Sequence, residues 1–283
     1  MINYHGMKEG NMNLKRHNPR RQLIVVAWCT FITCVLAGCS SGGANDQGEL
    51  FIKVLDAPAN YQEINIVVDR VSIHRTGSTP DVGWTVVSTT SSGKFNLLHL
   101  LNGRNLQLVL NKVAVGTYDQ IKLNYGACTI MADDLEQSLQ QDSSIQSGNT
   151  ILYGFQVVEG QQVQLTLDFD AYRSVLKNGE LYMFKPHIRV QNTLLSGSIA
   201  GSVLDSGRTV VPAAIVTYTG IDTVRTASEL PYGSFQLSDL PEGIYSVAVV
   251  PESPFLEADT INNIKVVRRL QTNLGAIHLQ YRK

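Results

Sequence analysis

Apolar and polar residues alternate along most of this chain, which is the pattern of strands that have one buried face and one wet face. Every second residue is apolar in 120–125 and again in 162–169. No long stretch carries apolar residues at the spacing of an amphipathic helix. Alternating strands of this kind are typical of antiparallel sheets that pack face to face. The sequence therefore predicts an all-β chain with two antiparallel β-sandwich domains.

Three shorter stretches carry more local predictions. The alternation shifts by one residue between 64–68 and 71–73, which is what a β-bulge at Asp69-Arg70 would produce. Leu pairs at helical spacing in 95–103 precede Asn-Gly, so we expect one helical turn ended by glycine. The polar stretch 133–150 predicts a solvated loop.

The amino-terminal segment has the three parts of an export signal. Basic residues cluster from Lys15 to Arg21, an apolar run extends over 23–37, and Leu36-Ala37-Gly38-Cys39 ends it. The run is too short to span a bilayer with ordinary flanks, so we expect a signal peptide rather than a membrane helix.

This segment resembles a bacterial lipoprotein signal. The resemblance implies cleavage before Cys39, a diacylglyceryl group on its sulfur, and acylation of the freed amine by a fatty acid such as palmitate. The membrane would then be a partner through the lipid anchor, since two or three acyl chains hold far more firmly than one. Ser40 in the next position resembles an outer-membrane sorting signal and implies that location, on a face that the sequence leaves open. A secretory signal with an incidental Cys39 is the alternative.

Charge and cysteine content limit which classes of partner the exported chain could bind. Residues 1–38 contain five basic residues and one acidic residue, which leaves 18 basic and 23 acidic residues and a net charge of −5. Nucleic acid binding needs clustered Lys and Arg, so we expect no nucleic acid partner. Cys128 would be the one cysteine left besides Cys39, and we expect a buried, inert thiol there.

The pattern divides the chain into four segments. Residues 1–38 would be the lipoprotein signal peptide, and 39–47, rich in Gly and Ser, a flexible tether. A first β domain would occupy 48–191, and a second, beginning where the pattern restarts, would occupy 196–283. Each domain is long enough to bury a core of its own.

Three blocks of the second domain share a pattern with a known family. They are Gly201-Ser202-Val203, Val211-Pro212-Ala213-Ala214-Ile215-Val216, and the run from Gly233 to Val247. On these residues the domain resembles the carboxypeptidase-regulatory-like, transthyretin-like sandwich of bacterial surface proteins. The resemblance implies a spacer or interaction module without catalysis. The spacing itself predicts that Phe235 and Leu237 face inward and that 241–243 form a tight turn.

Five blocks of the first domain carry a second resemblance. They are Val54–Ala59, Val68–Arg75, Gly116–Leu123, Leu167–Val175 and Lys185–Val190. On these blocks the segment 48–191 resembles an uncharacterised domain of bacterial envelope lipoproteins that carries only a domain-of-unknown-function label. The resemblance implies architecture and location, and no activity.

Polar residues at predicted strand ends form the first candidate site, namely Asp56, Asp168, Asp170, Arg173 and His187. Asp168 and Asp170 are two residues apart in a strand, so both carboxylates would lie on one face and could share a cation or sugar hydroxyls. The alternative is that Asp168 faces solvent while Asp170 caps the turn that follows. His187 has no second His or Cys at metal-ligand spacing, so we expect neither a metal site nor another cofactor.

Aromatic side chains offer a second candidate, a surface on which a sugar or a peptide could stack. The candidates are Tyr61, Trp84, Tyr153, Tyr172, Tyr182 and Tyr218. Trp84 lies beside Gly83 next to a predicted turn and is the first to test, although any one of these rings could belong to a core.

The sequence contains none of the motifs G-x-S-x-G, H-E-x-x-H, C-x-x-C or the P-loop. We therefore expect a non-catalytic, lipid-anchored envelope protein that binds a glycan or an envelope protein, or that presents another structure. A glycan hydrolase that uses Asp168 or Asp170 with another carboxylate is one alternative. A pilus-like assembly or adhesion subunit is the other, in which a long, uncharged sheet edge without Pro or Lys accepts a partner's strand.

Overall fold

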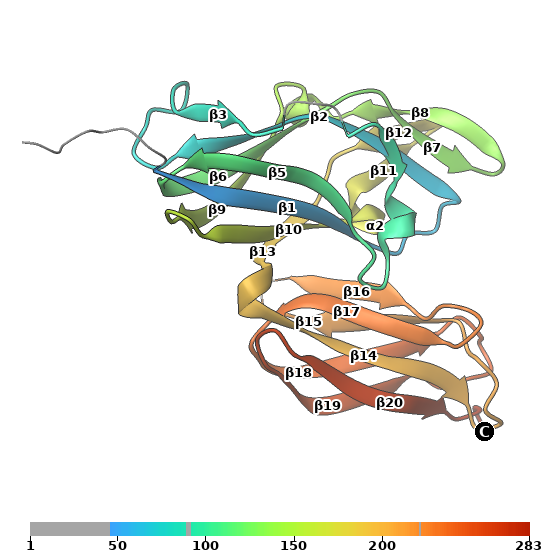
Figure 1. Cartoon of the computed structure of the whole chain (residues 1–283). Helices are drawn as coiled ribbons and strands as arrows, with labels where there is room; N and C mark the ends of the chain where they lie inside the picture. The colour runs from blue at the N-terminus through green and yellow to red at the C-terminus, as the bar shows by residue number, and fades with distance from the viewer. Residues whose placement is uncertain (1–45, 89–91, 221) are drawn as a thin grey trace, which may run out of the picture. The chain divides into compact units, whose positions relative to one another are not determined.

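The structure, a computed structural model, describes residues 46–88, 92–220 and 222–283. The predicted signal peptide and the lipid attachment at Cys39 lie outside these ranges and stay predictions. The described residues are mostly strand, which confirms the all-β prediction (Figure 1). None of the helices in these ranges has both the length and the apolar character needed to cross a bilayer.

The first domain is built from two sheets that share one core. The four-stranded sheet has the order β13-β10-β1-β5. Its strands are β1 (Gln47–Ala57), β5 (Leu106–Ala114), β10 (Gln162–Asp170) and β13 (Ile188–Asn192).

The nine-stranded sheet of the first domain follows the order β11-β12-β8-β7-β2-β6-β9, and β3 and β4 also pair with β2. Its strands are β2 (Glu63–Arg75), β3 (Trp84–Val86), β4 (Lys94–Asn96), β6 (Gly116–Tyr125), β7 (Cys128–Ala132), β8 (Leu135–Gln141), β9 (Asn149–Val157), β11 (Val175–Asn178) and β12 (Leu181–Phe184). Short helical turns connect the strands: η1 (Leu97–Leu100), η2 (Ser143–Ile145), α2 (Ala171–Ser174) and η3 (Thr193–Leu195).

The alternation of β10 places one side of the first core. Val163, Leu165, Leu167 and Phe169 are all buried there, and Phe184 of β12 is fully buried with them. Each such side chain contributes about 1.5–3 kcal/mol when it leaves water. The hydrophobic effect therefore fixes which face of β10 turns toward this core.

The second domain has its own core between two smaller sheets. One sheet has the order β17-β14-β20 and the other β16-β15-β18-β19. The strands are β14 (Ser196–Asp205), β15 (Ala213–Tyr218), β16 (Thr223–Ala227), β17 (Ser234–Pro241), β18 (Gly243–Pro251), β19 (Asp259–Val266) and β20 (Gln271–Leu279). Phe235 and Leu237 are buried in this core, as the spacing predicted, and β17 and β18 meet at the predicted turn.

Three strand pairs correct the prediction of purely antiparallel sheets. β1 with β10, β8 with β12, and β14 with β20 are parallel. Parallel neighbours need a long connection, and in each case strands of the facing sheet lie between the two partners in sequence. Residue alternation is the same for both directions of pairing, so it could not distinguish them.

The local predictions had mixed outcomes. The register between β2 and β6 shifts between Val68 and Arg70, which confirms the bulge. The helical turn is present as η1, and Gly103 after it has a φ of 79°. The loop predicted over 133–150 is wrong, because β8 and η2 lie within it. β8 was missed since Leu139 is its one buried residue and the remaining positions are polar or exposed. Cys128 is buried, and burial raises the pKa of its thiol.

Candidate functional site

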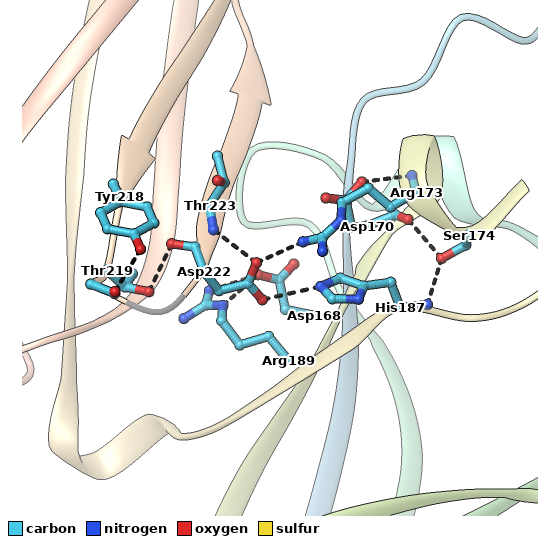
Figure 2. A network of polar contacts seen from close by, with 11 residues as sticks. Asp168, Asp170, Arg173, Ser174, His187, Arg189, Tyr218, Thr219, Asp222 and Thr223 are labelled. Atoms are coloured by element: carbon cyan, nitrogen blue, oxygen red, sulfur yellow. Dashed lines mark hydrogen bonds and ion pairs between the residues drawn. The ribbon is translucent and has the colours of Figure 1, made fainter.

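The predicted strand-end residues gather where the first domain meets the second. Asp168 and Asp170 end β10, Arg173 lies in α2, and His187 precedes β13. Figure 2 shows these four side chains next to Asp222, which comes from the turn between β15 and β16 of the second domain. We call this set of contacts between the two domains the junction.

Asp170 works as a helix cap. Its Oδ1 accepts a hydrogen bond from the Arg173 backbone N–H at 3.0 Å, while its backbone oxygen accepts one from Ser174 Oγ at 2.6 Å. Ser174 Oγ in turn accepts from the His187 backbone N–H at 2.9 Å (Figure 2). A carboxylate cap stabilises a helix start by about 1 kcal/mol. The arrangement matches the capping role proposed as the alternative for Asp170, and it fixes the segment that carries His187.

Asp168 forms a mostly buried ion pair with Arg189. Its Oδ2 accepts from Arg189 Nε at 3.2 Å and from Nη2 at 2.6 Å, and the two side chains are only 14% and 9% exposed. Burial raises the pKa of Asp168, although the Arg189 guanidinium acts in the opposite direction. The sequence alternative in which Asp168 faces solvent is therefore wrong, because Arg189 lies beside it on β13 and covers it.

Arg189 and Lys53 reach from the first domain to Asp239 of β17. Arg189 Nη1 donates to the Asp239 backbone oxygen at 2.9 Å, and Lys53 Nζ lies 3.4 Å from Asp239 Oδ2. The other carboxylate oxygen accepts from Ser196 Oγ at 3.1 Å. Asp239 is buried and has a φ of 53°, so the second domain holds it in an uncommon conformation to meet these two cations.

Asp222 completes the ionic part of the junction. Its Oδ1 accepts from Arg173 Nη1 and from the Thr223 backbone N–H, both at 2.8 Å, and His187 Nε2 lies 3.2 Å from Oδ2. Burial acts to raise the pKa of Asp222, but the hydrogen bonds from Thr223 and His187 outweigh it and lower that pKa. Because a carboxylate only accepts, His187 donates from Nε2 in this contact.

A neutral contact accompanies the ionic ones. Asn102, in the turn after η1, donates from Nδ2 to the Ala227 backbone oxygen at 3.0 Å. Its Oδ1 accepts from Thr226 Oγ1 at 2.7 Å and from the Gln236 backbone N–H at 2.9 Å. One amide side chain thereby bonds to both β16 and β17 of the second domain.

An ion pair lies beside this amide. Arg104 pairs with Glu229 of the second domain, and its Nη1 lies 3.2 Å from Glu229 Oε2. Sequence reasoning missed Asn102, Arg104, Arg189, Asp222, Asp239 and Glu229. The Asn102-Gly103 turn was the one local signal among them, and it was interpreted only as a helix stop.

The structure does not bring Trp84 into the junction. Trp84 lies on β3 at the nine-stranded sheet, and its indole Nε1 donates to the Pro80 backbone oxygen at 2.8 Å. The ring centroid is 5.0 Å from that of His74, and Lys122 Nζ lies 3.8 Å above the ring. Side chains of its own domain contact the partly buried indole, and the stacking role of Trp84 stays a prediction.

The carboxylates of the junction bond to groups of the protein itself. Glycoside hydrolysis needs two carboxyl groups facing an open space, one to donate a proton and one to attack or to activate water. Here Asp168 is paired with Arg189 and Asp170 caps α2. Over the described ranges, no group of three or more His, Cys, Asp or Glu side chains could hold a metal ion. What the geometry provides is a set of charged and polar bonds between two domains.

The solved structures that resemble this chain share little sequence identity with it. Solved structures that resemble the chain include the Bacillus anthracis TIE protein, at 10% identity over 92% of this chain and 45% of that one, with a TM-score of 0.26. The Streptococcal ancillary pilin matches at 12% identity over 85% of this chain and 64% of its own, with a TM-score of 0.20. A single-residue mutant of the shaft pilin SpaA of Lactobacillus rhamnosus GG matches at 8% identity over 85% and 99%, with a TM-score of 0.27. The chain spans less than two thirds of the first two of these.

No curated protein matches the sequence. Residues 47–186 match the family model described as "Domain of unknown function (DUF4382)". This range contains the first domain from β1 to β12, including Asp168 and Asp170. Over residues 47–186, just under half of its length, the chain is therefore similar to this uncharacterised family.

Proposed function

We propose that this chain is a non-catalytic envelope module in which the first domain holds the second through the junction. The observation that carries the proposal is the use of the candidate residues themselves. Asp168, Asp170 and His187, the side chains best placed for chemistry by sequence, bond to Arg189, to α2 and to Asp222. Asp168 and Asp170 thereby hold Arg189 and α2 of the first domain, and Arg189, Arg173 and His187 contact the second domain.

The proposal includes a lipid anchor at Cys39. A chain tied to the outer membrane through two or three acyl chains would hold both domains beside the bilayer, where the second could meet a glycan or an envelope protein. Mass spectrometry of the protein extracted from membranes tests this. We expect an amino terminus at Cys39 that carries a diacylglyceryl group and an amide-linked acyl chain. An unmodified Cys39 would overturn the anchor and leave the junction untouched.

Tumbling of the two domains in solution tests the attachment itself. The segment 46–283 contains both hydrophobic cores and lacks the anchor. We expect ¹⁵N relaxation to give one rotational correlation time for both domains, and two different values when Arg173→Ala is combined with Asp222→Ala. Lys94→Ala, which removes an exposed pair within the first domain, is the control. Independent tumbling of the unaltered segment would contradict the proposal.

A glycan hydrolase that uses Asp168 or Asp170 draws no support from this geometry. Assembly by strand addition has one observation in its favour. β9, at an end of the nine-stranded sheet, reads NTILYGFQV and contains no charged residue and no Pro. Leu152 in it is 80% exposed, whereas the register with β6 shifts between Tyr118 and Gln120, and such a bulge hinders strand addition.

Light scattering on the same segment decides this second candidate. Strand addition would produce dimers or longer assemblies as the concentration rises, because unpaired backbone groups of β9 would find partners. Leu152→Lys would place a charge on that edge and abolish them. A monomer at every concentration would remove self-assembly through β9 from consideration.

A further inference from the structure

A hollow of about 630 Å³ opens on the first domain at residues that take no part in the junction. The segment before β2, the turn between β7 and β8, and the hairpin of β11 and β12 line it. Its size falls in the range of small-molecule sites in proteins. The residues that matter for the argument are Tyr61, Gln62, Asp133, Asp134, Lys177 and Tyr182.

Two tyrosines form the aromatic wall of the hollow. The rings of Tyr61 and Tyr182 meet edge to face, with centroids 5.9 Å apart and an angle of 86° between planes. Tyr182 is buried and supports Tyr61, which is only half-buried and borders the hollow. Burial raises the pKa of the Tyr61 phenol, so its hydroxyl stays protonated and can donate. A partly open aromatic ring on a rigid support is suited to packing against C–H groups.

The opposite side of the hollow carries two carboxylates on a tight turn. Asp133 and Asp134 connect β7 to β8 with φ values of 51° and 61°. Hairpin turns of this kind usually hold Asn-Gly, because positive φ is unfavourable for other residues. Gln62 clamps the turn: its Nε2 donates to Asp134 Oδ1 at 2.6 Å, and its Oε1 accepts from the Asp134 N–H at 2.9 Å. The Asp134 carboxylate is therefore held in place before any ligand arrives, and Asp133 lies next to it on the same turn.

Lys177 supplies a donor to the same hollow. Its Nζ lies 5.2 Å from the centre of the Tyr182 ring, and the Tyr182 hydroxyl raises the pKa of this lysine. The lysine is thus a protonated donor beside groups that accept. Donors, acceptors and an aromatic wall now line one hollow.

From this arrangement we infer that the hollow binds one sugar ring of an uncharged glycan. The C–H face of the ring would pack on Tyr61, its hydroxyls would donate to Asp133 and Asp134, and one hydroxyl oxygen would accept from Lys177. The two carboxylates disfavour an anionic ligand, and among the described residues no group of three acidic, His or Cys side chains could hold a cation instead. This site goes beyond the attachment role proposed above and shares no residue with the junction.

Saturation-transfer NMR on the segment 46–283 tests the site. The probes are short cello-, chito-, manno- and galacto-oligosaccharides, each at up to about 10 mM, where even weak binding is measurable. We expect at least one series to give saturable signals, with amide shifts confined to the residues that line the hollow. Silence of all four series at this concentration overturns the inference. Failure here would leave the shared tumbling of the two domains unchanged, so it is distinguishable from failure of the proposed function.

Matched variants distinguish binding in the hollow from non-specific binding elsewhere on the surface. Tyr61→Ala should weaken binding about tenfold, the effect of losing one aromatic contact. Asp133→Asn should also weaken it, and this variant should fold normally because Asn accepts positive φ readily. Tyr232→Ala, at a tyrosine that is 76% exposed in the second domain, should leave it unchanged. Equal loss in all three variants, or none with Tyr61→Ala and Asp133→Asn, contradicts the inference.

Discussion

The junction and the open face of the first domain contain the same kind of ion pair in different surroundings. At the junction, Asp168 and Arg189 pair while only 14% and 9% exposed. On the open face, Lys94 and Glu136 pair while 48% and 47% exposed. Water screens the second pair and competes for its charges, whereas the first has little access to water. The comparison teaches that burial, rather than the presence of a pair, decides which charges hold this molecule together.

The largest effect should follow from removing one buried partner. Arg189→Ala leaves the Asp168 carboxylate without its cation and deletes the bond to the Asp239 backbone oxygen. We expect a loss of about 3–5 kcal/mol in the free energy of unfolding, measured by urea denaturation. Replacing both partners, Asp168→Leu with Arg189→Met, should recover much of it, because no buried charge is then left alone. A loss from Arg189→Ala below about 1 kcal/mol would refute the view that burial makes this pair matter.

A smaller loss should come from the neutral contact. Asn102→Ala removes three hydrogen bonds to β16 and β17 and places Ala at a φ of 55°. We expect about 2 kcal/mol, since partners in the second domain lose their bonds. Asn102→Gly keeps the backbone conformation without strain, so it isolates the hydrogen bonds. Wild-type stability in Asn102→Gly would show that the amide contributes nothing across the junction.

Acid should weaken the contacts of Asp222 before it unfolds the domains. The pKa of Asp222 is lowered in the folded protein, so its contribution is present above the ordinary carboxyl pKa of about 4 and is lost as the pH falls through the lower folded value. The pKa of Asp168 is raised instead, so protonation of this carboxyl in acid does not reduce the stability of the folded protein. We expect the shared tumbling of the two domains to weaken as the pH falls below about 4 and to be lost only below the lower folded pKa of Asp222.

Asp222→Asn is the matching variant for the acid experiment. It should already show weakened coupling of the domains at neutral pH, with little further change in acid, because the charge of the carboxylate is gone. Coupling that falls equally in this variant and in the unaltered protein would assign the acid effect to another group.

The smallest effect should come from the exposed pair. Lys94→Ala deletes the contact with Glu136, and the lysine lowers the pKa of that carboxyl. Because both side chains are open to water, we expect no measurable change in the urea midpoint. A shift as large as that of Arg189→Ala would abolish the distinction between the two regions.

Strands that bury many apolar side chains were easier to predict from the sequence than strands that bury few, or than which strands pair. β10 could be predicted because four of its residues are apolar at every second position, and hydrophobic burial acts on that pattern directly. β8 and β16 could not, since Leu139 alone, or Val224 with one threonine, faces inward. The parallel direction of the β1–β10 pair could not be predicted either, because residue alternation within a strand does not show which strand becomes its neighbour.

The sequence predicted that the candidate residues lie at strand ends, but it did not show which strands place them side by side. Asp56, Asp168 and Asp170 stand where β1 and β10 end, and the parallel pairing of these strands brings the ends together. Asp222 contacts Arg173 and His187, and Asp239 contacts Arg189, from another domain. No spacing rule connects residues so far apart in the chain. The Tyr61 hollow likewise combines three segments that are far apart in the sequence. The positive φ of Asp133 and Asp134 could not be predicted, because the sequence shows only two acidic residues in a polar stretch.

The central place of β1 has a consequence for how this polypeptide is made. β1 lies between β5 and β10, and its residue Ala57 finds its partner only at Asp170. Contacts between distant segments close slowly, because loop entropy is lost before the contacts form. A chain made from its amino end could pair β1 with β5 first, but the edge of β1 that pairs with β10 would stay open until Asp170 had followed. During that interval, the open edge of β1 presents unpaired backbone groups to which another strand could bind.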